Sequence, residues 1–224
     1  MGELTPDIRL ITAARLFPAC DLGADIGADH GRLSCYLLQT DKAARMIVSD
    51  ISEPSLEKAR ALFARHGLSA RADFIVADGL DALRAPVNAA LICGMGGSTI
   101  AKILLKSPER LCGAALVLSP HNDETVLRAA LESIEYTIEE EHIAPYRKAL
   151  YVVMRAVPGA MRLSARERYL GPMLMKETGD AYLKYLEKRQ RHISPGRGPE
   201  IEEKRGWIKE EIERVQQAER AKGL

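Results

Sequence analysis

The strongest constraint on the fold is a repeated alternation between short apolar runs and amphipathic stretches. The apolar runs lie at 22–27, 45–50, 72–76, 88–93 and 114–119, and helical patterns fill the intervals 31–40, 53–66, 97–106 and 123–133. Continuous apolar strands separated by helices are typical of a parallel sheet covered on both faces. We therefore predict an α/β fold in which helices pack on both sides of one mostly parallel sheet.

The pattern changes after the fifth apolar run. The stretches YTIEEEHIAPY and KALYVVMRAV predict two successive strands with no helix between them, and therefore an antiparallel hairpin at one edge of the sheet. Five alternating strands closed by a hairpin resemble the Rossmann-like sheet of class I methyltransferases more closely than the six-stranded fold that binds dinucleotides. Residues 1–158 are predicted to form this first domain.

After Pro158 and Gly159 the chain becomes helical and rich in charge. GDAYLKYLEKRQRHI predicts one helix, SPGRGP predicts a turn, and the remaining residues predict a second helix. A heptad-like spacing favours an antiparallel helix pair joined by Ile201, Ile208, Ile212 and Val215 on one side and Tyr182, Leu183 and Leu186 on the other. Residues 159–224 are thus expected to form a separate α-helical, coiled-coil-like domain.

The N-terminal stretch MGELTPDIRL predicts the start of a helix rather than a targeting signal. Thr5 is the expected N-cap, Pro6 the first helical residue, and Asp7 an acid near the positive end of the helix. No apolar run approaches the length of a membrane span, and no signal-peptide pattern is present. We therefore expect a cytoplasmic protein.

The four cysteines give no sign of a metal site or a disulfide framework. Cys20, Cys35, Cys93 and Cys112 are scattered without paired spacing. Cys93 is expected to pack rather than react, because the sequence pairs no base with it. No metal is expected, and a monomer is the favoured oligomeric state.

Charge is unevenly distributed along a chain whose net charge is +1. Residues 1–159 contain 17 Lys and Arg against 20 Asp and Glu, whereas residues 160–224 contain 15 against 11. A basic segment beside a nucleotide-binding domain favours a nucleic-acid partner, although charge on helices is more often a solvated face. The residues expected to contact RNA are Arg162, Arg166, Arg168, Lys184, Lys188, Arg189 and Arg191.

A glycine-punctuated turn, DIGADHG, follows the first predicted strand at residues 25–31. Such a turn lines the ligand crevice of a parallel sheet, and Gly27 and Gly31 allow the backbone to approach a ligand closely. Asp29 would repel the pyrophosphate of a dinucleotide. It suits S-adenosylmethionine instead, because that cofactor carries a positive sulfonium and a positive ammonium group. The alternative is that Asp29 is only the N-cap of the next helix.

Acidic residues lie at or just after the ends of the second and third predicted strands, and a glycine-rich stretch follows the fourth. Asp50 follows Asp25 at about the separation typical of an acid that binds ribose hydroxyls. Asp78 follows the third strand, where the amino group of the adenine would need an acceptor, and CGMGGSTI leaves open backbone after the fourth. The full set expected to contact the cofactor is Asp25, Gly27, Asp29, His30, Asp50, Ile51, Asp78, Gly79, Gly94, Met95 and Gly96.

Taken together, the motifs resemble those of the bacterial TrmK family, which methylates N1 of adenine 22 in tRNA. The resemblance rests on ADIGADHGRL, ADGL, CGMGGSTI, LVLSPHNDETVLRAAL and YLGPMLMKE, which occur in this order and span essentially the whole chain. It implies a Rossmann-like methyltransferase domain that uses S-adenosylmethionine and no metal. It also implies a helical domain that helps to hold tRNA.

The chain departs from the family pattern after the fifth strand. Family members usually have Gln-Pro-Asn there, whereas this chain has Ser119, Pro120 and His121, followed by Asn122. Methylation of adenine N1 gives a cationic product, which a nearby carboxylate would stabilise. Asp29 is therefore the first catalytic candidate, and His121 and Asn122 are the others.

Three alternatives stay open from the sequence. A divergent member or paralogue would methylate another substrate, because the groups expected to orient the target base are altered. A non-catalytic RNA-binding protein would bind tRNA without transferring a methyl group. An NAD-dependent oxidoreductase would place Asp50 on the ribose and a pyrophosphate on the first turn, which Asp29 disfavours.

Overall fold

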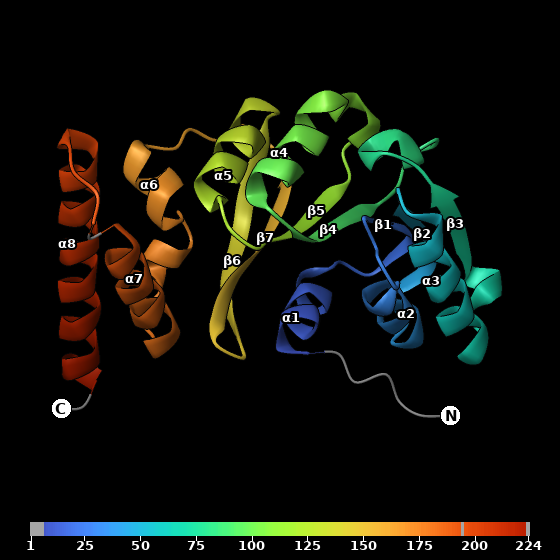
Figure 1. Ribbon diagram of the computed structural model, residues 1–224, viewed down its shortest axis with the longest axis horizontal. Coiled ribbons are helices and arrows are strands. Elements are labelled where there is room, and N and C mark those ends of the chain that lie inside the picture. Colours follow the sequence, from blue (N-terminus) through green and yellow to red (C-terminus); the bar gives the residue numbers. More distant parts are fainter. Residues whose placement is uncertain (1–6, 194, 223–224) are drawn as a thin grey trace.

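The computed structural model describes residues 7–193 and 195–222, and its centre is a single seven-stranded sheet (Figure 1). The strands are β1 Cys20–Ile26, β2 Ala43–Asp50, β3 Ala72–Val76, β4 Ala89–Met95, β5 Ala115–Pro120, β6 Tyr136–Tyr146 and β7 Ala149–Pro158. Their order is β3-β2-β1-β4-β5-β7-β6; β1 to β5 are parallel, and β7 is antiparallel to both β5 and β6. The predicted α/β class, parallel sheet and edge hairpin are confirmed.

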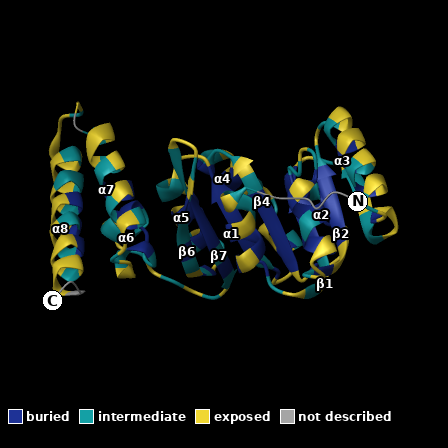
Figure 2. Cartoon of the chain, turned by 90° about the horizontal axis from the view of Figure 1, so that it is seen from below, coloured by how far each residue is buried: buried dark blue, intermediate teal, exposed yellow. Residues whose placement is uncertain are grey.

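The helices cover both faces of this sheet, as the alternation predicts. They are α1 Ile8–Leu16, α2 Arg32–Gln39, α3 Glu53–Arg65, α4 Gly97–Lys106, α5 Glu124–Ser133, α6 Ala165–Leu170, α7 Asp180–Ile193 and α8 Pro199–Lys222, with short 3₁₀ turns at Ser69–Arg71, Gly79–Ala82, Pro108–Leu111 and Leu174–Lys176. Alternate residues of β4 show the two faces: Ile92 packs in the core with α4 and α5, and Leu91 packs in the core with α1, α2 and α3. Figure 2 shows the strands as a buried layer between partly exposed helices. No helix within 7–193 or 195–222 is long and apolar enough to cross a bilayer.

Asp7 caps α1, which corrects the expected start of this helix. The carboxylate of Asp7 accepts hydrogen bonds from the backbone N–H groups of Arg9 and Leu10 at 3.0 and 3.4 Å. Thr5 and Pro6, the expected cap and first helical residue, lie outside the described residues. Asp7 therefore satisfies the unpaired N–H groups that begin every helix.

The two long C-terminal helices pack along an apolar seam, at the end of the molecule beside β6 (Figure 1). Tyr182 and Leu186 of α7 are fully buried, as are Ile208 and Val215 of α8. The predicted pairing of these helices is confirmed. Supercoiling of the pair stays a prediction.

A buried ion pair joins the C-terminal helices to the sheet. The Arg128 guanidinium of α5 lies 2.7 Å from the Glu141 carboxylate of β6, and both side chains are completely buried. Arg128 also donates to the carbonyl of Arg168 at 2.9 Å, and Glu141 accepts from the N–H of Met173 at 3.0 Å. Residues on both sides of the predicted boundary at 158/159 therefore share one continuous core, although the division into two domains stays a prediction.

Candidate functional site

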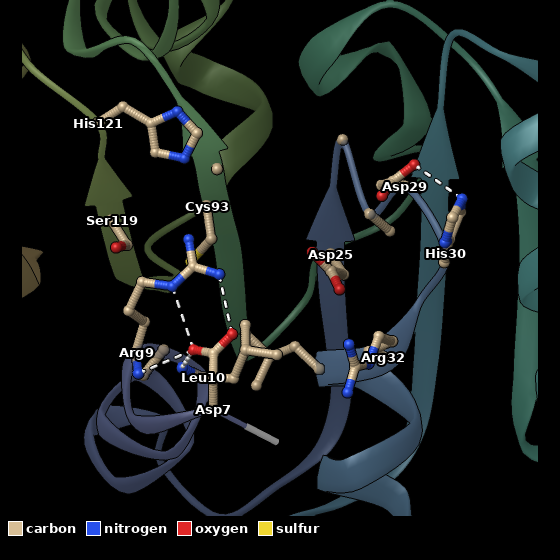
Figure 3. A pocket seen from close by; sticks show the side chains of 15 residues that line it. Asp7, Arg9, Leu10, Asp25, Asp29, His30, Arg32, Cys93, Ser119 and His121 are labelled. Carbon is tan, nitrogen blue, oxygen red and sulfur yellow. Dashed lines mark hydrogen bonds and ion pairs between the residues drawn. The ribbon is translucent and has the colours of Figure 1, made fainter. Parts of the chain in front are cut away.

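A cavity of about 340 Å³ opens beyond the carboxyl ends of β1, β4 and β5 (Figure 3). Because β1 lies between β2 and β4, this is the point at which the order of the parallel strands reverses, where open α/β sheets bind their ligands. The lining comes from α1, the β1–α2 turn, and the ends of β4 and β5: Asp7, Arg9, Leu10, Ala13, Asp25, Gly27, Ala28, Asp29, His30, Arg32, Leu33, Cys93, Gly94, Ser119 and His121.

The β1–α2 turn requires its two glycines. Gly27 has a φ of +71°, and a Cβ there would lie 1.8 Å from the Met95 methyl group. Gly31 has a φ of +64° and is itself the N-cap of α2, without a side-chain cap. The alternative role of Asp29 as the N-cap of this helix is therefore wrong.

Asp29 stands at the rim of the cavity with its carboxylate largely exposed, at 72%. Its backbone φ of +50° lies in the left-handed region, which Asp and Asn tolerate better than most residues. The N–H of Asp29 donates to the Asp50 carboxylate at 2.9 Å, and its own carboxylate lies 3.5 Å from His30 Nε2. Asp50 thus holds the turn that presents Asp29.

Asp25 lies deeper in the cavity, at the end of β1. It is buried and accepts a hydrogen bond from the Ser34 hydroxyl at 2.5 Å. Burial, together with the charge of Asp50, raises the pKa of Asp25 to about 6. A cation bound in the cavity would favour the ionised form of this carboxyl group.

The other predicted cofactor residues extend along the same edge of the sheet, outside the cavity lining. Asp50 ends β2 and is followed by Ile51, whereas Met95 ends β4 and is followed by Gly96. Asp78 and Gly79 follow β3, and the exposed Asp78 carboxylate pairs with Lys106 Nζ at 2.9 Å. The structure therefore brings Asp25, Gly27, Asp29, His30 and Gly94 into one cavity and places the others on its flanks.

His121 lies on the opposite side of the cavity from Asp29, just after the end of β5, and Asn122 follows it in the chain outside the lining. The His121 ring packs edge-on against Tyr151 at 5.7 Å, and burial together with nearby Arg9 lowers the pKa of His121. Asn122 lines a second cavity of about 400 Å³, which shares His121 with the first and reaches Lys188 of α7. His121 therefore stands between the two cavities.

Asp7, Arg9 and Arg32 line the cavity, although no sequence pattern identified them as site residues. Asp7 and Arg9 suggested only a helix start, because their approach to β1, β4 and β5 depends on long-range packing of α1 against the sheet. Charge at the start of a helix is common, so no local signal distinguishes them. Cys93 also lines the cavity, and burial raises the pKa of its thiol, which agrees with the expectation that it does not react.

Most of the predicted RNA contacts on the C-terminal helices have carboxylate partners within the protein. Within 4.0 Å, Glu132 pairs with both Arg162 and Arg168, and Arg166 pairs with Glu210 and Glu211. Lys184 pairs with Asp180, and Arg189 pairs with Glu124. Arg189 is also largely buried and stacks on Tyr169 and Tyr185, which gives it a structural role. Lys188 and Arg191 are exposed. RNA contact by these seven residues stays a prediction.

Comparison with known proteins agrees with the fold and identifies the family. The family model described as TrmK, tRNA (adenine(22)-N(1))-methyltransferase, matches residues 23–217. The tRNA (adenine(22)-N(1))-methyltransferase of Bacillus subtilis strain 168 is 31% identical over 201 residues, which cover 86% of this chain and 84% of that protein.

Solved structures of similar proteins share the architecture over nearly the full length. The B. subtilis m1A22 tRNA methyltransferase TrmK has a TM-score of 0.79 at 26% identity, covering 96% of this chain and 99% of that one. Streptococcus pneumoniae Sp1610 in complex with S-adenosyl-L-methionine has a TM-score of 0.82 at 26% identity, covering 95% and 99%. Because the family model matches most of the chain, this protein belongs to the TrmK family of tRNA (adenine(22)-N(1))-methyltransferases.

Proposed function

We propose that this protein transfers a methyl group from S-adenosylmethionine to N1 of adenine 22 in tRNA. The observation that carries the proposal is a carboxylate-lined cavity at the strand switch point of a chain that belongs to this family. The oxidoreductase alternative lacks support, because Asp29 stands where a pyrophosphate would bind. A divergent substrate remains the competing proposal, since Ser119 and His121 replace the family's Gln and Asn.

The residues present fit S-adenosylmethionine. Asp25 and Asp29 supply negative charge for its ammonium and sulfonium groups, and the turn with Gly27 presents both residues to the cavity. Both Asp50 oxygens accept a backbone N–H, from Asp29 and Ser52, and a carboxylate retains acceptor capacity for ribose hydroxyls. Asp78 is the corresponding acceptor for the adenine amino group. The cofactor supplies a methyl group that its sulfonium activates for displacement.

The protein's contribution to this reaction is orientation and electrostatics. Adenine N1 has an in-plane lone pair and attacks as a neutral group, so no covalent nucleophile is needed. Positive charge develops on the base, and the exposed Asp29 carboxylate at the cavity rim is placed to stabilise it. His121, whose pKa is lowered, stays neutral at pH 7 and does not oppose this charge.

The second cavity offers a path for the tRNA toward the site. The target base must leave its stack before it reaches the cofactor. Residues from the β5–α5 loop and α7 line this cavity, including Asn122, Lys188 and His192. Lysine there suits a phosphate near the displaced base.

A methyl-transfer assay with a matched pair of transcripts tests the function. Labelled S-adenosylmethionine is supplied with an unmodified tRNA transcript and with the same transcript carrying guanosine at position 22. We expect about one methyl group per adenosine-22 transcript and none on the control. Equal incorporation into both transcripts would point to another target, and binding of tRNA without incorporation would point to a non-catalytic protein.

A further inference from the structure

Arg9 is the arginine of the cavity whose side chain is most firmly held. Its Nε and Nη2 donate to the two carboxylate oxygens of Asp7 at 3.1 and 2.8 Å. Its guanidinium also lies over the rings of Tyr146 and Tyr151, at 4.6 and 4.7 Å from their centroids. These contacts come from α1, β6 and β7, and only a quarter of the side chain is exposed. Arg9 is therefore fixed before any ligand arrives.

This arrangement leaves one edge of the guanidinium available to a ligand. A guanidinium has five N–H donors and presents two edges that can each hold a carboxylate through parallel bonds. Asp7 occupies the Nε–Nη2 edge, so the Nη1–Nη2 edge remains. Figure 3 shows the guanidinium turned toward Cys93 in the cavity. The free edge thus faces the space in which the cofactor is proposed to bind.

Charge is divided between the two sides of the cavity (Figure 3). Asp25 and Asp29 lie on the β1–α2 side together with the exposed Arg32, and Arg9, paired with Asp7, lies on the side of β5 and His121. The amino-acid end of S-adenosylmethionine carries one ammonium and one carboxylate. Because Asp7 occupies only the Nε–Nη2 edge of Arg9, a cavity with Asp25 and Asp29 across from the free edge of that guanidinium is complementary to such a zwitterion.

We propose that Arg9 binds the carboxylate of the methionine moiety through its Nη1–Nη2 edge. Asp7, Tyr146 and Tyr151 act as positioning residues that hold the guanidinium in place. The inference rests on the proposed use of S-adenosylmethionine. It adds α1, which precedes the family's glycine-turn motif, to the cofactor site.

The test compares two ligands that differ in the amino-acid part. S-adenosylhomocysteine carries the ammonium and carboxylate, whereas 5′-methylthioadenosine keeps the adenosine and thioether but lacks both groups. Binding of each is measured by calorimetry in the absence of tRNA, with Arg9→Gln, Arg9→Lys and Arg32→Gln variants of the full chain. Arg32 is the matched control, because it is a second arginine that lines the cavity and is exposed.

Arg9→Gln should weaken S-adenosylhomocysteine about 10- to 100-fold, as expected for loss of a charge-assisted pair, and leave methylthioadenosine nearly unchanged. Arg9→Lys should fall between, since it keeps the charge and loses the fork. Arg32→Gln should change neither ligand more than about threefold.

Four results would overturn the assignment. They are an unchanged affinity of Arg9→Gln for S-adenosylhomocysteine, equal losses of affinity for both ligands, a loss with Arg32→Gln instead, and a wild-type protein that binds both ligands equally. A wild-type protein that binds neither ligand would instead refute the proposed cofactor itself. Asp7→Asn, which leaves Arg9 intact, keeps the inference testable if the Arg9 variants do not fold; it should weaken S-adenosylhomocysteine selectively, and an equal loss of both ligands would count against the assignment.

Discussion

The cavity at the carboxyl ends of the strands and the C-terminal helices both carry charged side chains, but they use them in different ways. In the cavity, Asp25, Asp29 and Arg9 keep hydrogen-bonding capacity for a ligand. In the C-terminal region, Arg166 and Arg189 are neutralised by glutamates. Charge in the cavity is available to a ligand, whereas Arg166 and Arg189 use their charge in ion pairs that join one helix to another.

Because the two regions share a core, deleting the helices is not a clean way to separate their roles. Removal of residues 160–224 would uncover Arg128 and Glu141, which are completely buried beneath them. Point substitutions in each region separate binding from stability instead.

Glu141→Gln should destabilise the protein by about 3–5 kcal/mol, because it leaves the Arg128 charge buried without a counter-charge. Urea denaturation measures this. Arg162→Ala is the control, since its side chain is 93% exposed and should change stability by no more than about 0.5 kcal/mol. Equal stability of Glu141→Gln and the wild type would mean that the pair does not join the two regions.

Asp29→Asn should lower turnover roughly 10- to 1000-fold without unfolding the protein, because it removes a charge beside the reacting base and keeps the size of the side chain. Steady-state kinetics with tRNA and a thermal melt measure both effects. Asp41→Asn is a matched control: Asp41 has a φ of +51° and lies outside the cavity lining. Similar turnover in both variants would remove Asp29 from the mechanism.

Asp50→Ala should weaken S-adenosylhomocysteine about 10- to 100-fold in calorimetry. The loss has two sources, since Asp50 is the proposed acceptor for the ribose hydroxyls and also accepts the N–H of Asp29. Asp73→Ala serves as the control, because Asp73 is an exposed acid of β3 paired with Arg45. Unchanged affinity in the Asp50 variant would rule out the ribose assignment.

Affinity for S-adenosylhomocysteine should rise with pH and level off above about 6. Folding raises the pKa of Asp25 from 3.8 to about 6. The contribution of this group to the stability of the fold is therefore complete below pH 3.8 and is lost as pH rises through about 6. A bound ammonium favours ionised Asp25, so affinity should fall up to about tenfold per pH unit below 6. Asp25→Asn should flatten this dependence in a calorimetric titration, and a profile unchanged by the substitution would assign the titration to another group.

Lys188→Ala should reduce the salt dependence of tRNA binding by about one phosphate contact, a slope change of roughly 0.7–0.9 in log affinity against log salt. Arg189→Ala should instead lower the melting temperature, because Arg189 pairs with Glu124 and stacks on Tyr169. Filter binding at several salt concentrations and a thermal melt distinguish the two. The comparison fails if Arg189→Ala alters the salt slope and Lys188→Ala does not.

Local sequence patterns predicted the carboxyl ends of the strands well, because strand length and turn glycines are visible in short stretches of sequence. The first two strands end at Ile26 and Asp50, close to the predicted ends at 27 and 50, and Gly27 marks a turn whose φ of +71° favours glycine. The order of parallel strands then brings those ends together. The approach of α1 to the cavity depends on packing between residues far apart in sequence, so Asp7 and Arg9 were missed.

The C-terminal cations were harder to interpret for a related reason. A lysine or arginine on a predicted helix gives no sign of which glutamate it will meet, and Arg166 and Arg189 meet partners more than 40 residues away. Burial of Arg189 against Tyr185 likewise depends on the tertiary fold. Net charge therefore identifies a basic region, but the pairing that decides which cations remain available is a property of the folded chain.

Nuclease digestion of the product tRNA followed by mass spectrometry shows directly whether the cavity supports methylation of N1 of adenine 22. We expect 1-methyladenosine in the fragment containing nucleotide 22, at a level that Asp29→Asn lowers and Asp41→Asn does not. 6-Methyladenosine at that position, or 1-methyladenosine in another fragment, would contradict this expectation.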